Sequence, residues 1–275
     1  MHWNRPAECA ATIRSSVAQI PGLHILVLDN SSSSANYAAL CQQLDPSVEV
    51  LRFQENKGWG PALNVALRKW LNDEISRYCF ISAHDAELAP DCLTRLQAAM
   101  DANPKLGIAC PQYPDCSVPH FSPLHGVSYK FVNPPRSDRV ESIDVPHGTL
   151  MIVRRECLAD IGLFDERYFA YGDEHELGVR ARRHGWEVGL VWGAIVANPQ
   201  TSTPSPGYLL TRNSLLLVHD YFGKWAASLR ALVILVNPMR LVIFPQQKNS
   251  WFSTRSQWRG FLDYFAGRFG SPPLR

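Results

Sequence analysis

Short apolar runs alternate with segments of helical periodicity along the first 190 or so residues, and this alternation constrains the fold more than any other feature. Runs typical of buried strands lie at Leu23–Asp29, Val48–Phe53, Tyr78–Ser82, Gly107–Cys110, Leu150–Val153 and Val188–Trp192. Helical spacing lies between them at Asn36–Leu44, after Pro61, after Pro90 and at Asp173–His184. This order predicts an α/β domain with a mostly parallel central sheet flanked by helices.

Polar residues at two strand ends are the first candidates for a binding site. Asp29 and Asp85 both follow apolar runs, and open α/β sheets bind ligands at the carboxyl ends of their strands. Asp29 is suited to accept hydrogen bonds from a nucleotide base or ribose. The alternative is that it caps a turn or helix together with Asn30 and Ser31.

The loop Asn56–Gly60 leads into a helix that has Pro61 in its first turn. Its glycines would let backbone N–H groups approach a ligand, and the helix dipole favours an anion at that end. A plain loop with turn glycines is the alternative reading.

Two further segments define the expected organisation of the chain. The segment Pro111–His147 is rich in Pro, Ser and His and has weak periodicity, so we expect a long loop that shapes a substrate site. Thr201–Gly207 is rich in Ser, Thr, Pro and Gly. We therefore expect a binding and catalytic domain over residues 1–200 and a helical, amphipathic extension over residues 201–275.

Composition narrows the class of protein. The chain is 46% hydrophobic with a formal net charge of +2, which favours a globular protein and gives no reason to expect nucleic acid as a partner. Its seven cysteines are scattered and none forms a CxxC pair, which argues against structural zinc and suggests reduced thiols in a cytoplasmic protein. We see no secretory signal and no apolar run of about eighteen residues.

Several segments, taken in order, resemble inverting family 2 glycosyltransferases of the GT-A fold, especially bacterial rhamnosyltransferase-like members. Val27–Ser31 resembles the family's VDNxS strand end, and Asn56–Asn64 resembles its NxGxAxxxN loop and helix. Phe80–Pro90 occupies the place of the DxD strand end. The similarity continues through Gly162–Glu166, Phe169–Leu177, Arg180, Gly185 and the pair Arg212-Asn213.

The resemblance implies roles for individual residues. It places the nucleotide near Asp29, Asn56, Gly58, Asn64 and His84, and a Mg²⁺ or Mn²⁺ cofactor near Asp85 and Asn198. It places the transferred sugar or the acceptor near His147, Gly148, Glu176 and Arg180. Ala83 stands where the family has its first acid, and Asn198 stands where many members have a metal-binding His, so the need for a metal stays open.

The acids of the segment Asp173–Glu176 are the candidates for general base. The resemblance assigns this role to Glu174, the second acid of the family's ED pair, with Asp173 as the fallback. Acids in a first helical turn also interact favourably with the helix dipole, which is the structural alternative.

The implied function is inverting transfer of a sugar, with dTDP-rhamnose or a UDP-sugar as candidate donors, to a glycan or lipid-linked acceptor in polysaccharide biosynthesis. The family's usual first strand is represented only by its end, at Met1–Pro6. From Tyr208 onward the chain is suited either to a membrane surface at the cytoplasmic face or to packing as a helical subdomain or dimer interface. The alternatives are a catalytically weak or inactive nucleotide- or sugar-binding relative, and a nucleotidyltransferase, whose Gly-rich loop with a following basic residue is not found before Leu23.

Overall fold

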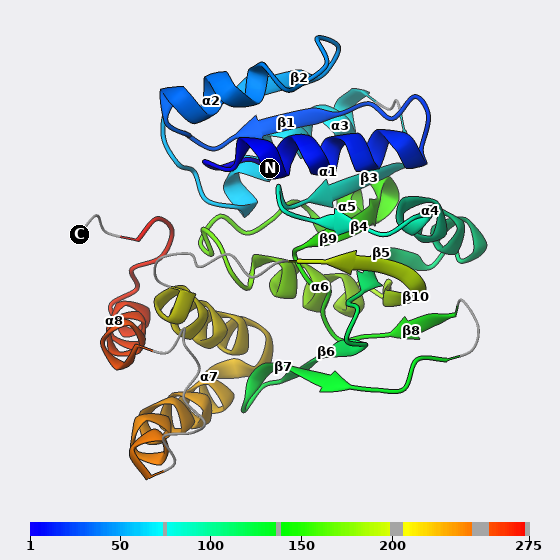
Figure 1. Ribbon diagram of the computed structural model, residues 1–275. Helices are drawn as coiled ribbons and strands as arrows, with labels where there is room; N and C mark the ends of the chain where they lie inside the picture. The colour runs from blue at the N-terminus through cyan, green and yellow to red at the C-terminus, as the bar shows by residue number, and fades with distance from the viewer. Residues whose placement is uncertain (74–75, 136–138, 199–205, 244–252, 273–275) are drawn as a thin grey trace.

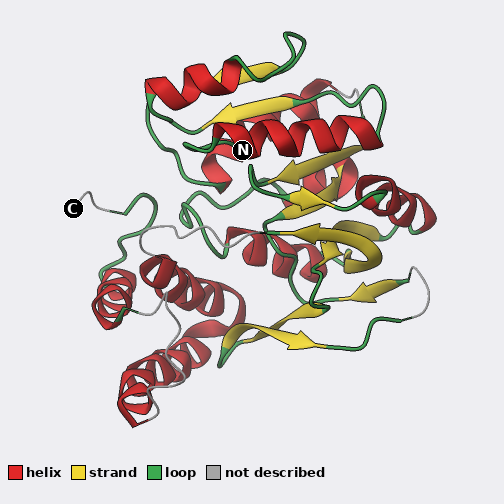
Figure 2. Ribbon diagram, in the orientation of Figure 1, coloured by secondary structure: helices red, strands yellow, loops and turns green. Residues whose placement is uncertain are grey.

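The computed structural model describes residues 1–73, 76–135, 139–198, 206–243 and 253–272. Its centre is a six-stranded sheet, with a two-stranded parallel pair above it and helices on both sides (Figure 1, Figure 2). The sheet runs in the order β3 (Tyr78–Ser82), β9 (Leu150–Arg154), β5 (Leu106–Gln112), β10 (Glu187–Ala197) and β4 (Glu87–Leu88), and β8 (Val140–Ser142) also pairs with β10. The separate pair is β1 (Leu26–Asp29) with β2 (Glu49–Arg52).

The central sheet is mixed, which corrects the expectation of a mostly parallel one. β5 and β10 are parallel, but β9 is antiparallel to both β3 and β5. The reason lies in the connection from β5 to β9, which contains strands and no helix within its described residues. Parallel neighbours need a long crossover, usually helical, and the path from β5 to its parallel neighbour β10 does contain helices.

Two apolar cores cover the two faces of this sheet. Met151 and Val153 of β9 pack with residues of α3 (Gly60–Asp73), α5 (Arg155–Ile161) and α6 (Asp173–Arg183). Leu150 and Ile152 pack instead with α4 (Cys92–Ala102). Successive strand residues point to opposite faces, so a continuous apolar strand supplies both cores. A smaller core joins β1 to α1 (Pro6–Gln19) and α2 (Ser34–Cys41).

The segment expected to be a long loop contains strands. β6 (Ser117–Ser122) and β7 (Gly126–Phe131) form an antiparallel hairpin, and β8 follows. The sequence pattern is weak because the side chains of β6 that face inward include Ser117 and Pro119 as well as Phe121. Pairing between β6 and β7 provides hydrogen-bond partners for their backbone N–H and C=O groups.

The chain ends in α7 (Pro206–Ile243) and α8 (Thr254–Phe265). Gly223, at a φ of 85°, divides α7 into two helical parts. The first part packs Leu216 and Leu217 against Val145 and Tyr168 of the α/β domain. Within the part of the chain that the structure describes, no helix is both long and apolar enough to cross a bilayer.

Candidate active site

The first turn of α6 carries Glu174 and Asp173, the candidates for general base, and Glu176, which was expected near the substrate. Asp173 is the most deeply buried of the three. Its side chain is fully inaccessible to solvent, and its Oδ2 accepts a 2.9 Å hydrogen bond from the backbone N–H of Gly60. Burial, followed by the negative charge of Glu174, raises the pKa of Asp173 well above its ordinary value. This shift favours the protonated form of the carboxyl group, which disfavours Asp173 as a base.

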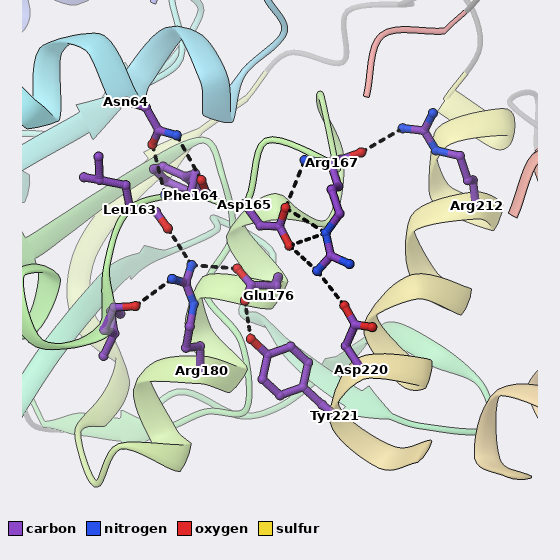
Figure 3. Close-up of polar contacts among 11 residues, drawn as sticks. Asn64, Leu163, Phe164, Asp165, Arg167, Glu176, Arg180, Arg212, Asp220 and Tyr221 are labelled. Carbon is purple, nitrogen blue, oxygen red and sulfur yellow. Dashed lines mark hydrogen bonds and ion pairs between the residues drawn. The ribbon is translucent and has the colours of Figure 1, made fainter. Parts of the chain in front are cut away.

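Glu176 is committed to a buried polar network (Figure 3). It forms a 2.8 Å ion pair with Arg180, and it accepts a hydrogen bond from the hydroxyl of Tyr221 on α7. Arg180 also donates to the carbonyl oxygens of Ile161 and Leu163 at 2.6 and 2.7 Å. Both residues, which we expected near the substrate, thus hold α6 to its surroundings.

Glu174 differs from these two acids. Its side chain is 14% exposed, its Oε2 accepts a 3.1 Å hydrogen bond from the backbone N–H of Gly172, and its Oε1 lies 3.5 Å from His175 Nε2. Gly148 lies directly beside it, since a Cβ built on Gly148 would lie 3.5 Å from Glu174 Oε1. The structure therefore brings together Glu174 and Gly148, which are 26 positions apart in the sequence.

An aromatic and hydroxyl cluster adjoins Gly148. His147 is buried, its Nε2 lies 2.7 Å from the carbonyl oxygen of Pro111, and its ring stacks on the ring of Tyr113 at 4.3 Å between centroids. A carbonyl oxygen can only accept, so His147 Nε2 is the donor. Burial lowers the pKa of His147 to about 4, so the ring is neutral near pH 7. The Tyr113 hydroxyl lies 2.8 Å from Thr149 Oγ1, to which Asn198 Nδ2 donates at 3.1 Å.

Tyr113 was missed by our reading of the sequence, whereas Thr149 belongs to the segment His147–Thr149, which the resemblance placed near the donor sugar or the acceptor. Tyr113 directly follows the last residue of β5, and Thr149 directly precedes β9. The position of Tyr113 just beyond the carboxyl end of a strand is a signal that could have identified it.

The segment Ala83–Asp85 lies next to this cluster. The backbone N–H of Ala83 donates a 2.9 Å hydrogen bond to the carbonyl of Thr149. Antiparallel pairing of Ala197 with Glu87 brings Asp85 and Asn198, just beyond these residues, to the same end of the sheet. Asp85 is buried, at 6% exposure. Within the described ranges, no group of three or more His, Cys, Asp or Glu side chains is arranged to hold a metal ion.

Asp29 lies at the end of β1, where the sequence placed it, but its carboxylate contacts the protein scaffold. Its Oδ1 lies 2.8 Å from His2 Nδ1, and its Oδ2 lies 3.4 Å both from Ser32 N and from Arg52 Nε. His84 approaches the ring of His2 edge to face at 6.2 Å. Burial lowers the pKa of His84 to about 4. His2 and Arg52 carried no signal in our sequence reading.

The loop before α3 is held by amide side chains. Asn30 Nδ2 donates to Asn56 Oδ1 and to the carbonyl of Gly58, both at 2.9 Å, and Asn56 Oδ1 also accepts from Gly58 N–H. Gly58 has a φ of +89°, and a Cβ there would lie 2.2 Å from the carbonyl oxygen of Phe169. The glycine is thus required for the close approach of these two loops.

Asn64, expected near the nucleotide, faces the segment before α6 (Figure 3). It donates to the carbonyl of Phe164 at 2.9 Å, accepts from Phe164 N–H at 3.0 Å and reaches Glu166 at 3.0 Å. Asn64 therefore holds the segment that precedes α6 against α3.

A cavity of about 680 Å³ lies between β1 and β3, under α1 and α3. Its lining includes Ala83 and His84 but not Asp29, Asp85 or Glu174. The cavity therefore borders the candidate site at Ala83 and His84, and it does not connect Asp29, Asp85 and Glu174.

The chain is similar to known proteins over most of its length. The model of the family described as glycosyl transferase family 2 matches residues 2–162, more than half of the chain. The chain is 27% identical over 244 residues to the N-acetylglucosaminyl-diphospho-decaprenol L-rhamnosyltransferase of Mycobacterium tuberculosis, covering 75% of this chain and 78% of the relative.

Two solved structures support the expected GT-A fold. One is GalNAc-T7 with UDP, GalNAc and Mn²⁺, with a TM-score of 0.60 and 14% identity, covering 75% of this chain and 44% of that chain. The other is the mannosyltransferase PcManGT of Pyrobaculum calidifontis with GDP-Man and Mn²⁺, with a TM-score of 0.57 and 15% identity, covering 97% and 83%. At this level of identity the likeness concerns the fold alone.

Proposed function

Because the chain belongs to glycosyl transferase family 2 and is a glycosyltransferase, we propose that it transfers a sugar with inversion, from a nucleotide-sugar donor to a hydroxyl group of a glycan or lipid-linked acceptor. The observation that carries this proposal is the different state of the three acids at the start of α6. Asp173 is buried with a raised pKa, and Glu176 is paired with Arg180. Glu174 alone of the three combines partial exposure with a position beside Gly148.

Glu174 acts as the general base in this mechanism. Its carboxylate takes the proton of the acceptor hydroxyl as that oxygen attacks the anomeric carbon, while the nucleoside diphosphate leaves from the opposite side. Its position at the start of α6 is held by the hydrogen bond from Gly172 N–H to Oε2. General base assistance of this kind is typically worth ~10²–10⁴-fold in rate.

The donor diphosphate is assigned to the end of the sheet where Asp85 and Asn198 lie. Asp85 supplies a carboxylate, and Asn198 supplies an amide oxygen. The Nδ2 of Asn198 donates to Thr149 Oγ1. Mg²⁺ and similar ions bind through one or two protein carboxylates plus substrate phosphates, so this small donor set fits such an ion. When bound, the ion would neutralise charge on the leaving diphosphate. His84, Asp29, Asn56 and Gly58 would border the nucleotide.

The substrate class is proposed from the relatives. The mycobacterial relative is named for L-rhamnose transfer to a decaprenol-linked acceptor, so we propose dTDP-rhamnose or a UDP-sugar as donor and a lipid-linked saccharide as acceptor. We further propose that the reaction takes place at the cytoplasmic face of a membrane, with residues 1–200 as the catalytic domain and residues 201–275 as an extension that contacts the membrane.

The test is a transfer assay with dTDP-, UDP- and GDP-sugars, with and without Mn²⁺, on the wild type and on Glu174→Gln. We expect turnover with one donor class and its loss by at least about 100-fold in the variant, with nucleotide binding retained. Glu156→Gln, which changes a half-exposed surface acid on α5, should keep full turnover. Full turnover by Glu174→Gln would remove Glu174 from the mechanism.

The presence of Ala83 where the family has its first acid favours one second candidate, a relative that binds a nucleotide or sugar without turnover. The same assay separates the two. A donor that raises the melting temperature of the wild type, with no transfer or hydrolysis under any metal condition, would favour the binding protein.

A further inference from the structure

The loop from Tyr168 to Gly172, which leads directly into the candidate base, has an unusual backbone. Phe169 and Tyr171 have φ values of 65° and 63°, and Gly172 has a φ of 90°. Residues other than glycine rarely adopt this left-handed region and persist there only where the surroundings hold them. The loop therefore needs an external support to keep this shape.

Two buried side chains of α7 provide such a support. Asn213 is 1% exposed, and its Nδ2 lies 2.9, 2.9 and 2.7 Å from the carbonyl oxygens of Tyr168, Ala170 and Tyr171. Arg212, which is fully buried, donates from Nη2 to the carbonyl of Tyr168 at 3.1 Å and reaches that of Arg167 (Figure 3).

The two side chains also orient each other. Arg212 Nε donates to Asn213 Oδ1 at 3.0 Å, which fixes the amide so that its NH₂ group faces the loop. The donors are thus preorganised on a helix and directed at the carbonyl groups of the loop.

The loop in turn contacts both halves of the candidate site. The carbonyl of Phe169 accepts a hydrogen bond from Trp59 N–H at 2.5 Å, beside Gly58. At the other end, Gly172 N–H donates to the carboxylate of Glu174, and the carbonyl of Gly172 accepts from Glu176 N–H at 2.9 Å. A shift of this loop would therefore move the Glu174 carboxylate.

From these contacts we infer that Arg212 and Asn213 are positioning residues: they hold the Tyr168–Gly172 loop in its left-handed conformation and thereby aim Glu174 at the acceptor hydroxyl. This inference rests on the proposed function for its kinetic consequence. The loop before α3, which is proposed to border the donor nucleotide, has its own support in Asn30 and Asn56. Loss of the contacts that Arg212 and Asn213 make with the Tyr168–Gly172 loop, which we call the clamp, should therefore affect turnover more than donor binding.

The experiment uses the full chain with Asn213→Ala and Asn213→Asp. The first removes the donors, and the second keeps the size of the side chain but directs a carboxylate at three carbonyl oxygens. Ser214→Ala is the matched control, because Ser214 lies next in α7 and is bonded to Arg230 rather than to the loop. Steady-state kinetics and amide hydrogen exchange of the loop are measured for each variant.

For both Asn213 variants we expect kcat to fall about 100-fold, with the donor KM within about 3-fold of wild type. We expect faster exchange in the loop and no change in either readout for Ser214→Ala. Unchanged loop exchange in the Asn213 variants, or an equal loss of kcat in the control, would overturn the clamp. Hydrogen exchange needs no turnover, so an inactive wild type would contradict the proposed function while the exchange result still decides the clamp.

Discussion

The backbone N–H of Gly60 donates a 2.9 Å hydrogen bond to Oδ2 of Asp173, which joins the first residue of α3 to the first residue of α6. The bond connects the end of the loop before α3 to the helix that carries Glu174, the candidate base. Because Asp173 is fully buried and its Oδ1 has no hydrogen-bond partner among the described residues, its neutral form suits this environment better than its ionised form.

Replacing Asp173 with Asn should therefore change how stability depends on pH. The pKa of Asp173 is raised above its ordinary value of 3.8, so its contribution to stability is complete below that value and is lost as the pH rises toward the folded-state pKa. Asn keeps an acceptor for Gly60 and does not ionise. Urea unfolding should show the stability of Asp173→Asn rising relative to that of the wild type as the pH is raised from about 4 to about 8. The exposed Asp115→Asn is the control, and a difference independent of pH would contradict the assignment.

Glu176→Gln should lower stability rather than act directly on the chemistry. Gln can still accept a hydrogen bond, but the variant leaves the largely buried Arg180 guanidinium without the opposite charge 2.8 Å away, and removing one charge of a buried pair typically costs about 3 kcal/mol or more. Glu49→Gln, which removes an exposed pair with Lys69, should change the free energy of unfolding by less than about 1 kcal/mol. Equal effects of the two changes in chemical denaturation would show that the Glu176 network is not stabilising.

Gly58→Ala should destabilise the chain more than Gly22→Ala. Both glycines have positive φ, but a Cβ at Gly22 meets nothing within 4 Å, whereas at Gly58 it would lie 2.2 Å from the carbonyl oxygen of Phe169. The Gly22 variant isolates the conformational cost of about 1–2 kcal/mol. The Gly58 variant adds a backbone clash that must move the loop before α6, so kcat should fall as well. Similar unfolding free energies for the two variants would contradict the close contact.

Acid should destabilise the protein through histidines that are buried in the neutral form. Burial lowers the pKa of His147 and of His175 from 6.5 to about 4. Their contribution to stability is therefore present above pH 6.5 and is lost as the pH falls toward 4. His147→Gln, which retains a donor for Pro111, should make the loss of stability over this range smaller in urea unfolding. His184→Gln, at an exposed surface ion pair, should leave the slope unchanged, and an unchanged slope in His147→Gln would refute the prediction.

Local sequence determined the elements and the identity of the chemical groups. Apolar runs placed β3 and β9 almost to the residue. β9 is buried along its whole length, and a strand buried on both faces needs a continuous apolar stretch. The position of Asp29 and Asp85 after such runs, and the acids at the start of α6, were likewise evident from order along the chain.

Tertiary structure alone decided which of these groups are available for chemistry. Asp173, Glu174 and Glu176 are near neighbours in sequence, yet one is buried beside Gly60, one is paired with Arg180, and one borders Gly148. The direction of β9, the pairing of β6 with β7 and the clamp of Asn213 on the Tyr168–Gly172 loop also depend on partners far away along the chain. Burial and hydrogen-bond partners are set by these long-range contacts, and they determine which carboxylate is free to accept a proton.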